Sequence, residues 1–289
     1  MSHFYKYLLP FAAIFALVYI ALSLIVLKWQ SRLIFVPSQK IEITPKELDV
    51  PYDEVWLPVN QTDRLHGWWI PSPVPRIGVV LYFHGNANNI SSHINEARMF
   101  RQLGFDVLLV DYRGYGRSVG QFPNEERVYQ DAQIAWDYLT QQKSVEPQDI
   151  FIYGHSLGGA IAIELAVNNP QVAALIIEGS FTSIRQMGES RTFFSIFPLD
   201  LIVHQHFDSL SKIKHLQMPL LFIHGIEDTV VPAKMSQVLY DAATAPKKLL
   251  LVPNADHNDV ALVGGEKYWQ TVWEFYQMVR SDRGKVVSR

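Results

Sequence analysis

A serine at position 156 stands between two glycines in the stretch IYGHSLGGA, residues 152–160. The G-x-S-x-G pattern exposes a serine hydroxyl on a sharp turn when a buried strand precedes it and a helix follows it. Here the apolar run DIFIYG precedes Ser156, and the helical pattern LGGAIAIELAV follows it. We therefore predict that Ser156 is a nucleophile and that the backbone N–H of Leu157, at the helix N-terminus, faces a developing oxyanion.

A glycine-rich turn that binds phosphate is the alternative for this stretch. Turns of that class carry G-x-x-x-x-G-K-[ST] or G-x-G-x-x-G, and neither pattern occurs here. The strand and helix patterns on either side of the serine favour the nucleophile instead.

A serine nucleophile needs a histidine base that an acid orients. Asp228 follows the apolar run PLLFIHG, and His257 follows the next run, KKLLLVP. Because the carboxyl ends of parallel strands share one edge of a sheet, loops there can bring both side chains to Ser156. We predict that His257 is the base and Asp228 its acid, in the chain order serine, acid, histidine.

Other acidic residues near these loops are given lesser roles. Glu227 is the alternative orienting acid, while Asp256 and Asp259 lie too close to His257 in sequence to orient it easily. In the glycine-rich loop DYRGYGRSVG, Asp111 and Arg113 are expected to form a structural ion pair, with a substrate clamp as the alternative.

The second oxyanion donor is expected from the loop HGNANN, which follows the apolar run ending at Phe83. The backbone N–H of Asn86 is the first candidate and that of Ala87 the second. Three histidines beside the turns are expected to brace the loops rather than react: His84, His155 and His224. No H-E-x-x-H or other metal-ligand spacing occurs, so neither a metal nor a cofactor is predicted.

Strand and helix patterns alternate along the chain that must position these residues. Continuous apolar runs, typical of strands buried on both faces, lie at 77–83, 105–112, 149–154, 172–178, 219–225 and 247–253. Helical patterns lie between them at 90–103, 124–142, 157–168, 233–243 and 266–280. VWLPV and LHGWWI read as a strand pair with a turn near residues 60–63. This alternation predicts one mostly parallel, twisted sheet with helices on both faces.

Residues 179–218 interrupt the alternation and are predicted to form a short, cap-like insert over the site. The alternative is a packing insert that contacts no ligand. Its apolar residues are candidates either for an acyl pocket or for core: Phe193, Phe194, Ile196, Phe197, Leu199, Leu201 and Ile202, with the three phenylalanines foremost.

The N-terminal region contains an uncharged apolar stretch from residue 7 to residue 27. At 1.5 Å per residue it spans roughly the 30 Å hydrocarbon core of a bilayer. A cleaved signal peptide, whose apolar region is typically shorter, is the alternative. We expect an N-terminal transmembrane anchor at 1–30, a Pro-rich linker at 31–52 and a catalytic domain at 53–289. The charge bias favours a cytoplasmic catalytic domain only weakly, and a signal anchor would place it outside, so the membrane side stays open.

The composition restricts the classes of function. The net charge is -3, with no clustered Lys and Arg surface to indicate a nucleic-acid partner. The absence of cysteine excludes disulfides, a cysteine nucleophile and thiolate metal sites.

The motifs HGNANN, DYRGYGRSVG, GHSLGG, HGIEDTVVP and NADHND occur in this order across about 175 residues. In order and spacing they resemble the α/β-hydrolase superfamily. With the anchor, they are similar to the membrane-anchored members of its serine aminopeptidase-like branch. That branch includes bacterial inner-membrane hydrolases and eukaryotic relatives that act on lipids or S-acylated proteins. The resemblance implies a triad of Ser156, Asp228 and His257, with Asn86 and Leu157 as oxyanion donors.

These observations predict a membrane-anchored serine hydrolase that cleaves carboxylic esters or thioesters of acyl-bearing amphiphiles through an acyl-enzyme. The lack of a full lid domain argues against long triglycerides, and the resemblance favours the bacterial inner membrane. One alternative is an aminopeptidase, in which Glu178 or Glu189 would hold the substrate amine. The other is a catalytically silent, membrane-tethered binding protein on the same scaffold.

Overall fold

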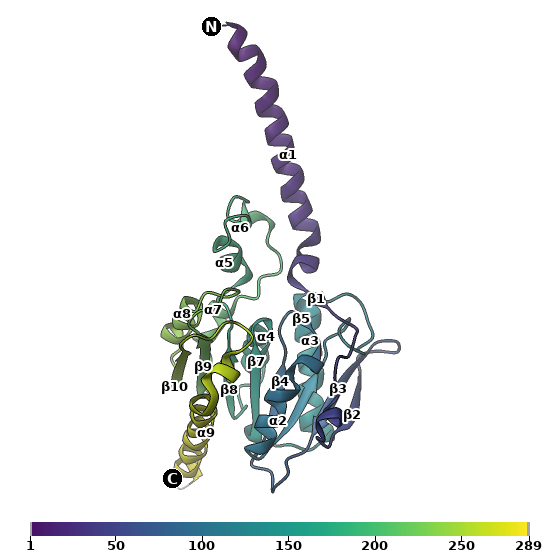
Figure 1. The fold of residues 1–289 in the computed structure, drawn as a ribbon, viewed down its shortest axis with the longest axis vertical. Coiled ribbons are helices and arrows are strands. Elements are labelled where there is room, and N and C mark those ends of the chain that lie inside the picture. The colour runs from purple at the N-terminus through teal and green to yellow at the C-terminus, as the bar shows by residue number, and fades with distance from the viewer. Residues whose placement is uncertain (1, 288–289) are drawn as a thin grey trace.

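An eight-stranded sheet forms the centre of the computed structural model, which describes residues 2–287 and the side chains of residues 10–281. Its strands lie in the order β10-β9-β8-β7-β4-β6-β3-β2 (Figure 1). Their bounds are β2 Asp53–Pro58, β3 Arg64–Ile70, β4 Gly78–Phe83, β6 Phe105–Val110, β7 Ile150–His155, β8 Ala174–Glu178, β9 Leu220–Gly225 and β10 Lys247–Val252. Strands β10 through β6 pair in parallel. Strand β3 pairs antiparallel with both β6 and β2, so it alone runs against the other strands of this sheet. The predicted mostly parallel sheet is therefore confirmed.

The apolar runs of the sequence became the central strands because those strands are covered on both faces. Every residue of β4, β6, β7, β8 and β9 is buried. One face packs against α3 (Glu125–Asp137), α4 (Leu157–Asn168) and α8 (Lys234–Ala242). The other packs against α2 (Ile94–Gln102) and α9 (Val260–Val287). Two apolar layers thus hold the sheet edge at which the predicted site residues lie.

Three helices differ from their predicted bounds in ways the backbone explains. The segment predicted at 90–103 begins with a 3-10 turn, Ile90–His93, before α2. The segment predicted at 124–142 ends in a π-helical turn, Tyr138–Gln142, after α3. Helix α9 begins six residues earlier than predicted, and at Gly265, where φ is 48°, its backbone breaks from helical geometry. A positive φ of this kind favours glycine.

The insert between β8 and β9 contains three short helices, α5 (Ile184–Glu189), α6 (Leu199–Ile202) and α7 (Ser209–Ile213). Figure 1 shows α5 and α6 rising from the body of the molecule beside α1. Helix α6 contacts α1. The insert therefore touches the N-terminal helix as well as the sheet edge.

Helix α1 (Ser2–Ile34) extends away from the body as one long rod (Figure 1). Its segment Pro10–Ile34 has a mean hydropathy of 2.6 and is long and apolar enough to span a membrane. A signal sequence near an N-terminus meets the same criteria of length and composition. The helix also continues four residues past the anchor bounds expected from the sequence, and its last turn lies against the body of the molecule.

The segment expected as a linker is held against the rest of the molecule by backbone pairing. Strand β1 (Val36–Pro37) pairs in parallel with β5 (Ala87–Asn88), inside the loop HGNANN. The N–H of Val36 donates to the carbonyl of Asn86 at 2.8 Å. A short 3-10 helix, Pro45–Leu48, follows. The end of α1 is thereby joined by backbone hydrogen bonds to the loop predicted to supply an oxyanion donor.

Candidate active site

Ser156 occupies the turn between the end of β7 and the start of α4. Its backbone is strained, with φ 55° and ψ -119°, and its N–H donates to the carbonyl of Glu178 at 2.8 Å. The close turn requires both flanking glycines: a Cβ on Gly158 would overlap the carbonyl oxygen of Phe83, and one on Gly154 would overlap the Gly158 carbonyl. The G-x-S-x-G pattern therefore forms the sharp strand–turn–helix corner expected from the sequence, while the role of Ser156 as a nucleophile stays a prediction.

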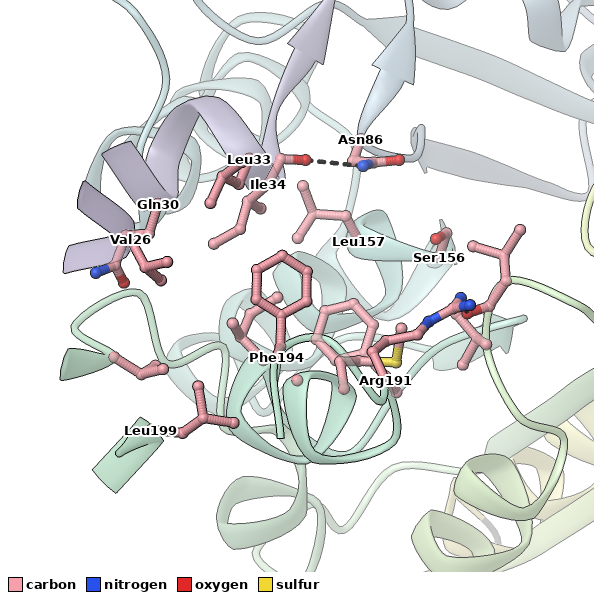
Figure 2. Close-up of a pocket in the computed structure, with 17 residues that line it drawn as sticks. Val26, Gln30, Leu33, Ile34, Asn86, Ser156, Leu157, Arg191, Phe194 and Leu199 are labelled. Carbon is pink, nitrogen blue, oxygen red and sulfur yellow. Dashed lines mark hydrogen bonds between the residues drawn. The ribbon is translucent and has the colours of Figure 1, made fainter. Parts of the chain in front are cut away.

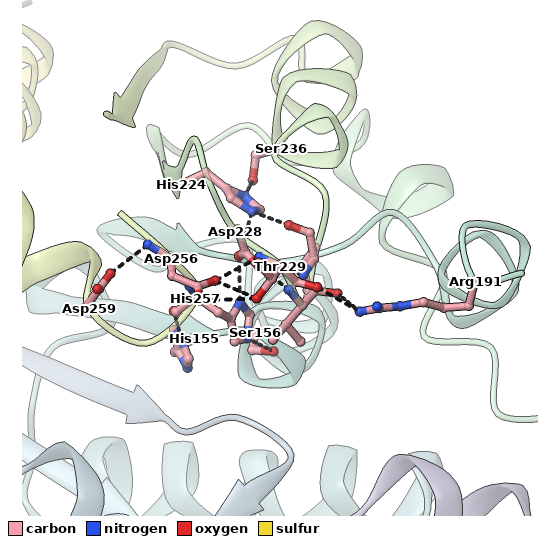
Figure 3. A network of polar contacts seen from close by, with 12 residues as sticks. His155, Ser156, Arg191, His224, Asp228, Thr229, Ser236, Asp256, His257 and Asp259 are labelled. Atoms are coloured by element: carbon pink, nitrogen blue, oxygen red, sulfur yellow. Dashed lines mark hydrogen bonds and ion pairs between the residues drawn. The ribbon is translucent and has the colours of Figure 1, made fainter. Parts of the chain in front are cut away.

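The three residues of the predicted triad lie in one hydrogen-bonded chain (Figure 3). His257 Nε2 is 2.9 Å from Ser156 Oγ, and His257 Nδ1 is 2.6 Å from Asp228 Oδ2. Ser156 is 6% exposed and His257 5%. This geometry allows the imidazole to take the serine proton while the carboxylate holds its other ring nitrogen.

The carboxylate of Asp228 is buried and fully engaged. Its Oδ1 accepts from the N–H groups of Val230 at 2.8 Å and Val231 at 2.6 Å, and its Oδ2 is also 3.0 Å from His224 Nε2. Burial alone would raise the pKa of Asp228, but the hydrogen bonds from His224 and His257 outweigh it and hold the pKa below its ordinary value. Glu227, the alternative acid, is exposed.

Asp256 connects the acid loop to the histidine loop, a role that the sequence reasoning did not assign. Its carboxylate accepts from the N–H and hydroxyl of Thr229, at 2.8 and 3.0 Å, and from the N–H of His257 at 2.7 Å. Asp259 in turn accepts from the N–H of Asp256 at 2.7 Å. The signal available in the sequence was the spacing D-H-N-D, which is typical of side chains that bond nearby backbone groups.

Asn86, the first oxyanion candidate, is fixed in orientation by three hydrogen bonds. Its side-chain amide donates to the carbonyl of Ile34 at 2.8 Å, and its own carbonyl accepts from Val36 N–H and from the Tyr115 hydroxyl at 2.6 Å. Asn86 and Leu157 both line the pocket that contains Ser156. Ala87, the second candidate, lies in β5 and is exposed.

The bracing histidines make the contacts expected of structural residues. His84 is fully buried, with Nδ1 2.8 Å from the carbonyl of Gly85. His155 Nε2–H donates to the carbonyl of His257 at 3.1 Å. Burial, with the neighbouring His257 second, lowers the pKa of His155 to about 4, so its ring is neutral at pH 7.

The predicted ion pair between Asp111 and Arg113 is wrong. Arg113 pairs instead with Asp131 of α3, at 2.7 Å, and Asp111 lies 3.4 Å from His84 Nε2. Asp111 also accepts from the N–H of Ile90 at 2.9 Å. The two side chains leave the loop toward different neighbours, so their closeness in sequence does not bring their charges together.

An apolar pocket of about 250 Å³ leads away from Ser156 (Figure 2). Four of its lining residues come from α1: Val26, Gln30, Leu33 and Ile34. Others come from the insert, among them Met187, Arg191, Phe194 and Leu199. The contribution of α1 to the pocket was not predicted, because its apolar sequence indicates only a membrane anchor.

The three phenylalanines proposed for an acyl pocket have different positions. Phe194 lines the pocket, whereas Phe193 is 63% exposed. Phe197 is buried outside the pocket lining, where its ring stacks on Tyr19 of α1 with centroids 6.0 Å apart. One of the three therefore faces the space next to Ser156, and a second joins the insert to α1.

A second, polar cavity of about 450 Å³ lies beside Ser156 and His257. Glu178 and Glu96 are among its lining residues. Burial raises the pKa of Glu178 to about 7, opposed by the hydrogen bond that Tyr268 donates to it. Glu189, the other residue considered for an amine, instead pairs with Arg185 on the insert at 2.9 Å.

No group of three or more His, Asp or Glu side chains placed to hold a metal ion occurs among the residues that the structure describes.

Comparison with known proteins decides the family. Residues 75–199 match the family model described as serine aminopeptidase, S33, and residues 198–285 match one described as PhoPQ-activated pathogenicity-related protein. The chain is 34% identical over 280 residues to alpha/beta hydrolase domain-containing protein WAV2 of Arabidopsis thaliana, covering 89% of this chain and 90% of that protein. The chain belongs to the α/β-hydrolase family. This α/β hydrolase is also 35% identical over 246 residues to protein bem46 of Schizosaccharomyces pombe, covering 80% and 79% of the two chains.

Solved structures agree with the fold of this α/β hydrolase. A Pyrococcus furiosus esterase, Pf2001, superimposes with a TM-score of 0.69 at 21% identity, over 84% of this chain and 98% of that one. An acylaminoacyl peptidase of Pyrococcus horikoshii gives 0.65 at 17% identity, over 79% and 41%. At such identities the likeness shows the α/β-hydrolase fold alone.

Proposed function

We propose that this α/β hydrolase is a serine hydrolase that cleaves carboxylic esters or thioesters of acyl-bearing amphiphiles. The observation that carries the proposal is the hydrogen-bonded chain from Ser156 through His257 to Asp228, which stands at the end of an apolar pocket. A binding protein that had lost catalysis would be expected to have lost a member of this chain. The apolar pocket suits the acyl chain, and the polar cavity on the same serine suits the leaving group.

The first half of the reaction forms an acyl-enzyme. Ser156 Oγ attacks the carbonyl carbon while its proton passes to His257 Nε2, and the negative charge moves to the carbonyl oxygen. The N–H groups of Asn86 and Leu157 would stabilise that oxyanion. When the tetrahedral intermediate collapses, the bond to the leaving oxygen or sulfur breaks, and the imidazolium returns its proton to the leaving group.

The second half releases the acid with the same groups. A water molecule gives a proton to His257 and attacks the acyl carbon, and the ester bond to Ser156 Oγ breaks as the imidazolium returns that proton to the serine. Asp228 keeps its negative charge throughout, because its pKa lies below the ordinary range. It therefore holds the imidazole in one tautomer and stabilises the imidazolium form.

A substrate series tests this proposal. Full-length protein in detergent or nanodiscs is given p-nitrophenyl esters of rising chain length, the matching thioesters and aminoacyl-anilides. Hydrolysis of esters or thioesters that disappears in Ser156→Ala is the expected result. A folded wild-type protein that hydrolyses none of these substrates would contradict the proposal.

An amide hydrolase that recognises an amine is the second candidate, supported by the position of Glu178 in the polar cavity beside Ser156. Burial keeps this carboxyl largely protonated below pH 7, so binding an ammonium group would require it to ionise. A preference for aminoacyl-anilides that is lost in Glu178→Gln would favour this candidate over the esterase.

The proposed organisation of the chain keeps its three parts. Residues 1–30 act as a membrane anchor, 31–52 as a linker and 53–289 as the hydrolase domain with its insert at 179–218. Supporting this division are the apolar segment Pro10–Ile34 and the sheet that begins at β2.

A further inference from the structure

Helix α1 presents one buried stripe to the rest of the molecule within an otherwise exposed apolar surface. Its buried or half-buried residues recur at helical spacing: Tyr19, Ser23, Val26, Leu27, Gln30, Ser31 and Ile34. The opposite side stays open, with Leu24 56% exposed and Ile25 54% exposed. The part of α1 nearest the catalytic domain therefore has one side on protein and one side free for lipid.

The insert covers this stripe and is hydrogen-bonded to it. Gln30, which is 5% exposed, donates to the carbonyl of Ile202 at 2.9 Å and accepts from the N–H groups of His204 and Gln205, each at 2.9 Å. Further along α1, the Tyr19 hydroxyl donates to the carbonyl of Ile196 at 2.9 Å. The insert thus follows α1 from Gln30 back to Tyr19.

The contact between Tyr19 and Ile196 places the insert tip, residues 192–203, beside the apolar stretch of α1, at bilayer depth when α1 spans a membrane. Lys28 is the first charged residue after the apolar stretch, and Tyr19 lies nine residues before it. At 1.5 Å per residue this is about 14 Å along the helix, close to half of a hydrocarbon core of about 30 Å. Residues that contact Tyr19 therefore lie much deeper in the hydrocarbon core than Lys28.

The insert tip has the chemistry of a segment that contacts lipid. Its exposed large side chains are apolar, with Leu201 83% exposed, Phe193 63% and Ile196 58%, and the short polar residues Thr192 and Ser195 are exposed beside them. Asp200, its one charged residue, pairs with Arg185 at 2.6 Å. Most of its backbone donors bond carbonyls of residues 191–199: the N–H groups of Phe194, Ser195, Phe197, Leu199, Leu201, Ile202 and Val203. Unpaired backbone N–H groups are the main free-energy cost of placing a segment in hydrocarbon, and these hydrogen bonds reduce that cost.

The apolar pocket runs between the same two elements. Val26 and Leu33 of α1 form part of its wall, and Phe194 and Leu199 of the insert tip form another part (Figure 2). Ser156 and Leu157 stand at its other end. The pocket is therefore bounded by two elements that each have exposed apolar side chains.

We propose that the insert tip and α1 together form a lateral portal, through which the acyl chain of a membrane-resident amphiphile passes directly from the leaflet into the pocket at Ser156. The portal rests on the proposed function and on α1 spanning the bilayer. It commits the substrate to a lipid or lipidated molecule whose acyl chain already lies in the membrane. The occupant of the exposed tip is accordingly the hydrocarbon layer of that leaflet.

A labelling experiment that needs no activity tests the position of the tip. The chain contains no cysteine, so single-cysteine variants can be spin-labelled in the full-length protein in phosphatidylcholine nanodiscs. Leu201→Cys in the tip is compared with Leu262→Cys on α9, because both leucines are 83% exposed. We expect the label at 201 to collide more with oxygen than with a water-soluble nickel chelate, and the label at 262 to do the reverse. An aqueous profile at 201 would overturn the portal even if the protein proves to be an esterase.

A pair of adjacent variants on α1 tests the path of the chain. Val26→Trp fills the pocket wall, whereas Ile25→Trp adds the same bulk on the open side of the helix. We expect Val26→Trp to lower kcat/KM for a long-chain ester in vesicles while sparing a short soluble ester, and Ile25→Trp to spare both. Equal values of kcat/KM for the long-chain ester in the two variants would contradict the portal. If the wild-type protein hydrolyses no ester at all, that result would instead contradict the proposed function.

Discussion

At the scale of single residues, the site combines groups whose protonation states are set by burial and by hydrogen bonds. Asp228 is kept ionised by His224 and His257 despite its burial, while His155 beside the triad is kept neutral. The positions of Ser156, Asp228 and His257 at strand ends were predictable, because an apolar run followed by a polar residue marks the carboxyl edge of a parallel sheet. Their catalytic roles stay predictions.

Replacing Asp228 and Glu227 one at a time should show which of these two carboxylates orients the imidazole. Asp228→Asn removes the charge that fixes the imidazole, so we expect kcat to fall by about 10³–10⁴-fold. Glu227→Gln changes an exposed side chain and should leave kcat nearly unchanged. Steady-state kinetics on a short ester measure both. Similar losses in the two variants would show that the assignment of the acid is mistaken.

Glu178 should make stability depend on pH. Its pKa is raised from 4.5 to about 7 by burial, so between these values the folded protein keeps a proton that the unfolded chain releases. Stability from this group therefore falls as the pH rises from 4.5 to 7 and is level above that range. The difference in free energy of unfolding between Glu178→Gln and wild type should therefore be up to about 3 kcal/mol more favourable to the variant at pH 8 than at pH 4.5. Denaturant unfolding at both pH values measures the difference, and a parallel pH response in the two proteins would argue against a buried, protonated Glu178.

At the scale of elements, the central strands and the helix α4 follow from the sequence, whereas the packing of α1 against the insert does not. The apolar runs specify strands because both faces of the sheet are covered. In α1 nearly every residue is apolar, which hides the stripe that faces protein. The polar residues Ser23 and Gln30, one heptad apart within that stripe, were the available signal. The predicted ion pair of Asp111 and Arg113 is wrong for a related reason, because closeness in sequence does not determine the direction in which two side chains leave a loop.

Gln30 should hold the insert against α1. Gln30→Leu leaves the backbone groups of Ile202, His204 and Gln205 without their partner, at a cost of about 1–3 kcal/mol for each buried group that finds no other. We expect faster proteolysis within residues 190–206 and a lower melting temperature in detergent. Gln237→Leu, whose native side chain bonds Asp241 along α8, is the matched control. Unchanged proteolysis of the insert in Gln30→Leu would contradict this role.

At the scale of the whole molecule, the long N-terminal helix α1 and the α/β-hydrolase fold are bonded to each other. The carbonyl of Ile34 accepts from the side chain of Asn86, and β1 pairs with β5 in the same loop. The helix that is long enough to span a bilayer is thus bonded to the loop that is proposed to bind the oxyanion. This arrangement explains why the chain connecting them is not a free tether.

Retention of α1 in the mature protein is a direct consequence. If the helix is part of the pocket, it is not removed as a signal peptide. We expect peptides from α1 to be recovered from the purified protein, and the protein to resist carbonate extraction from membranes. A mature protein that begins beyond residue 20 would contradict an uncleaved anchor, and a C-terminal reporter fusion identifies the side of the membrane.

The most direct test of the central claim is covalent labelling of the full-length protein by a fluorophosphonate, followed by mapping of the modified residue. An activated serine displaces fluoride from phosphorus, so we predict stoichiometric labelling of Ser156, loss of that label in Ser156→Ala, and strong reduction in His257→Ala. A folded wild-type protein that takes up no label, or takes it up at a serine other than Ser156, would contradict the account.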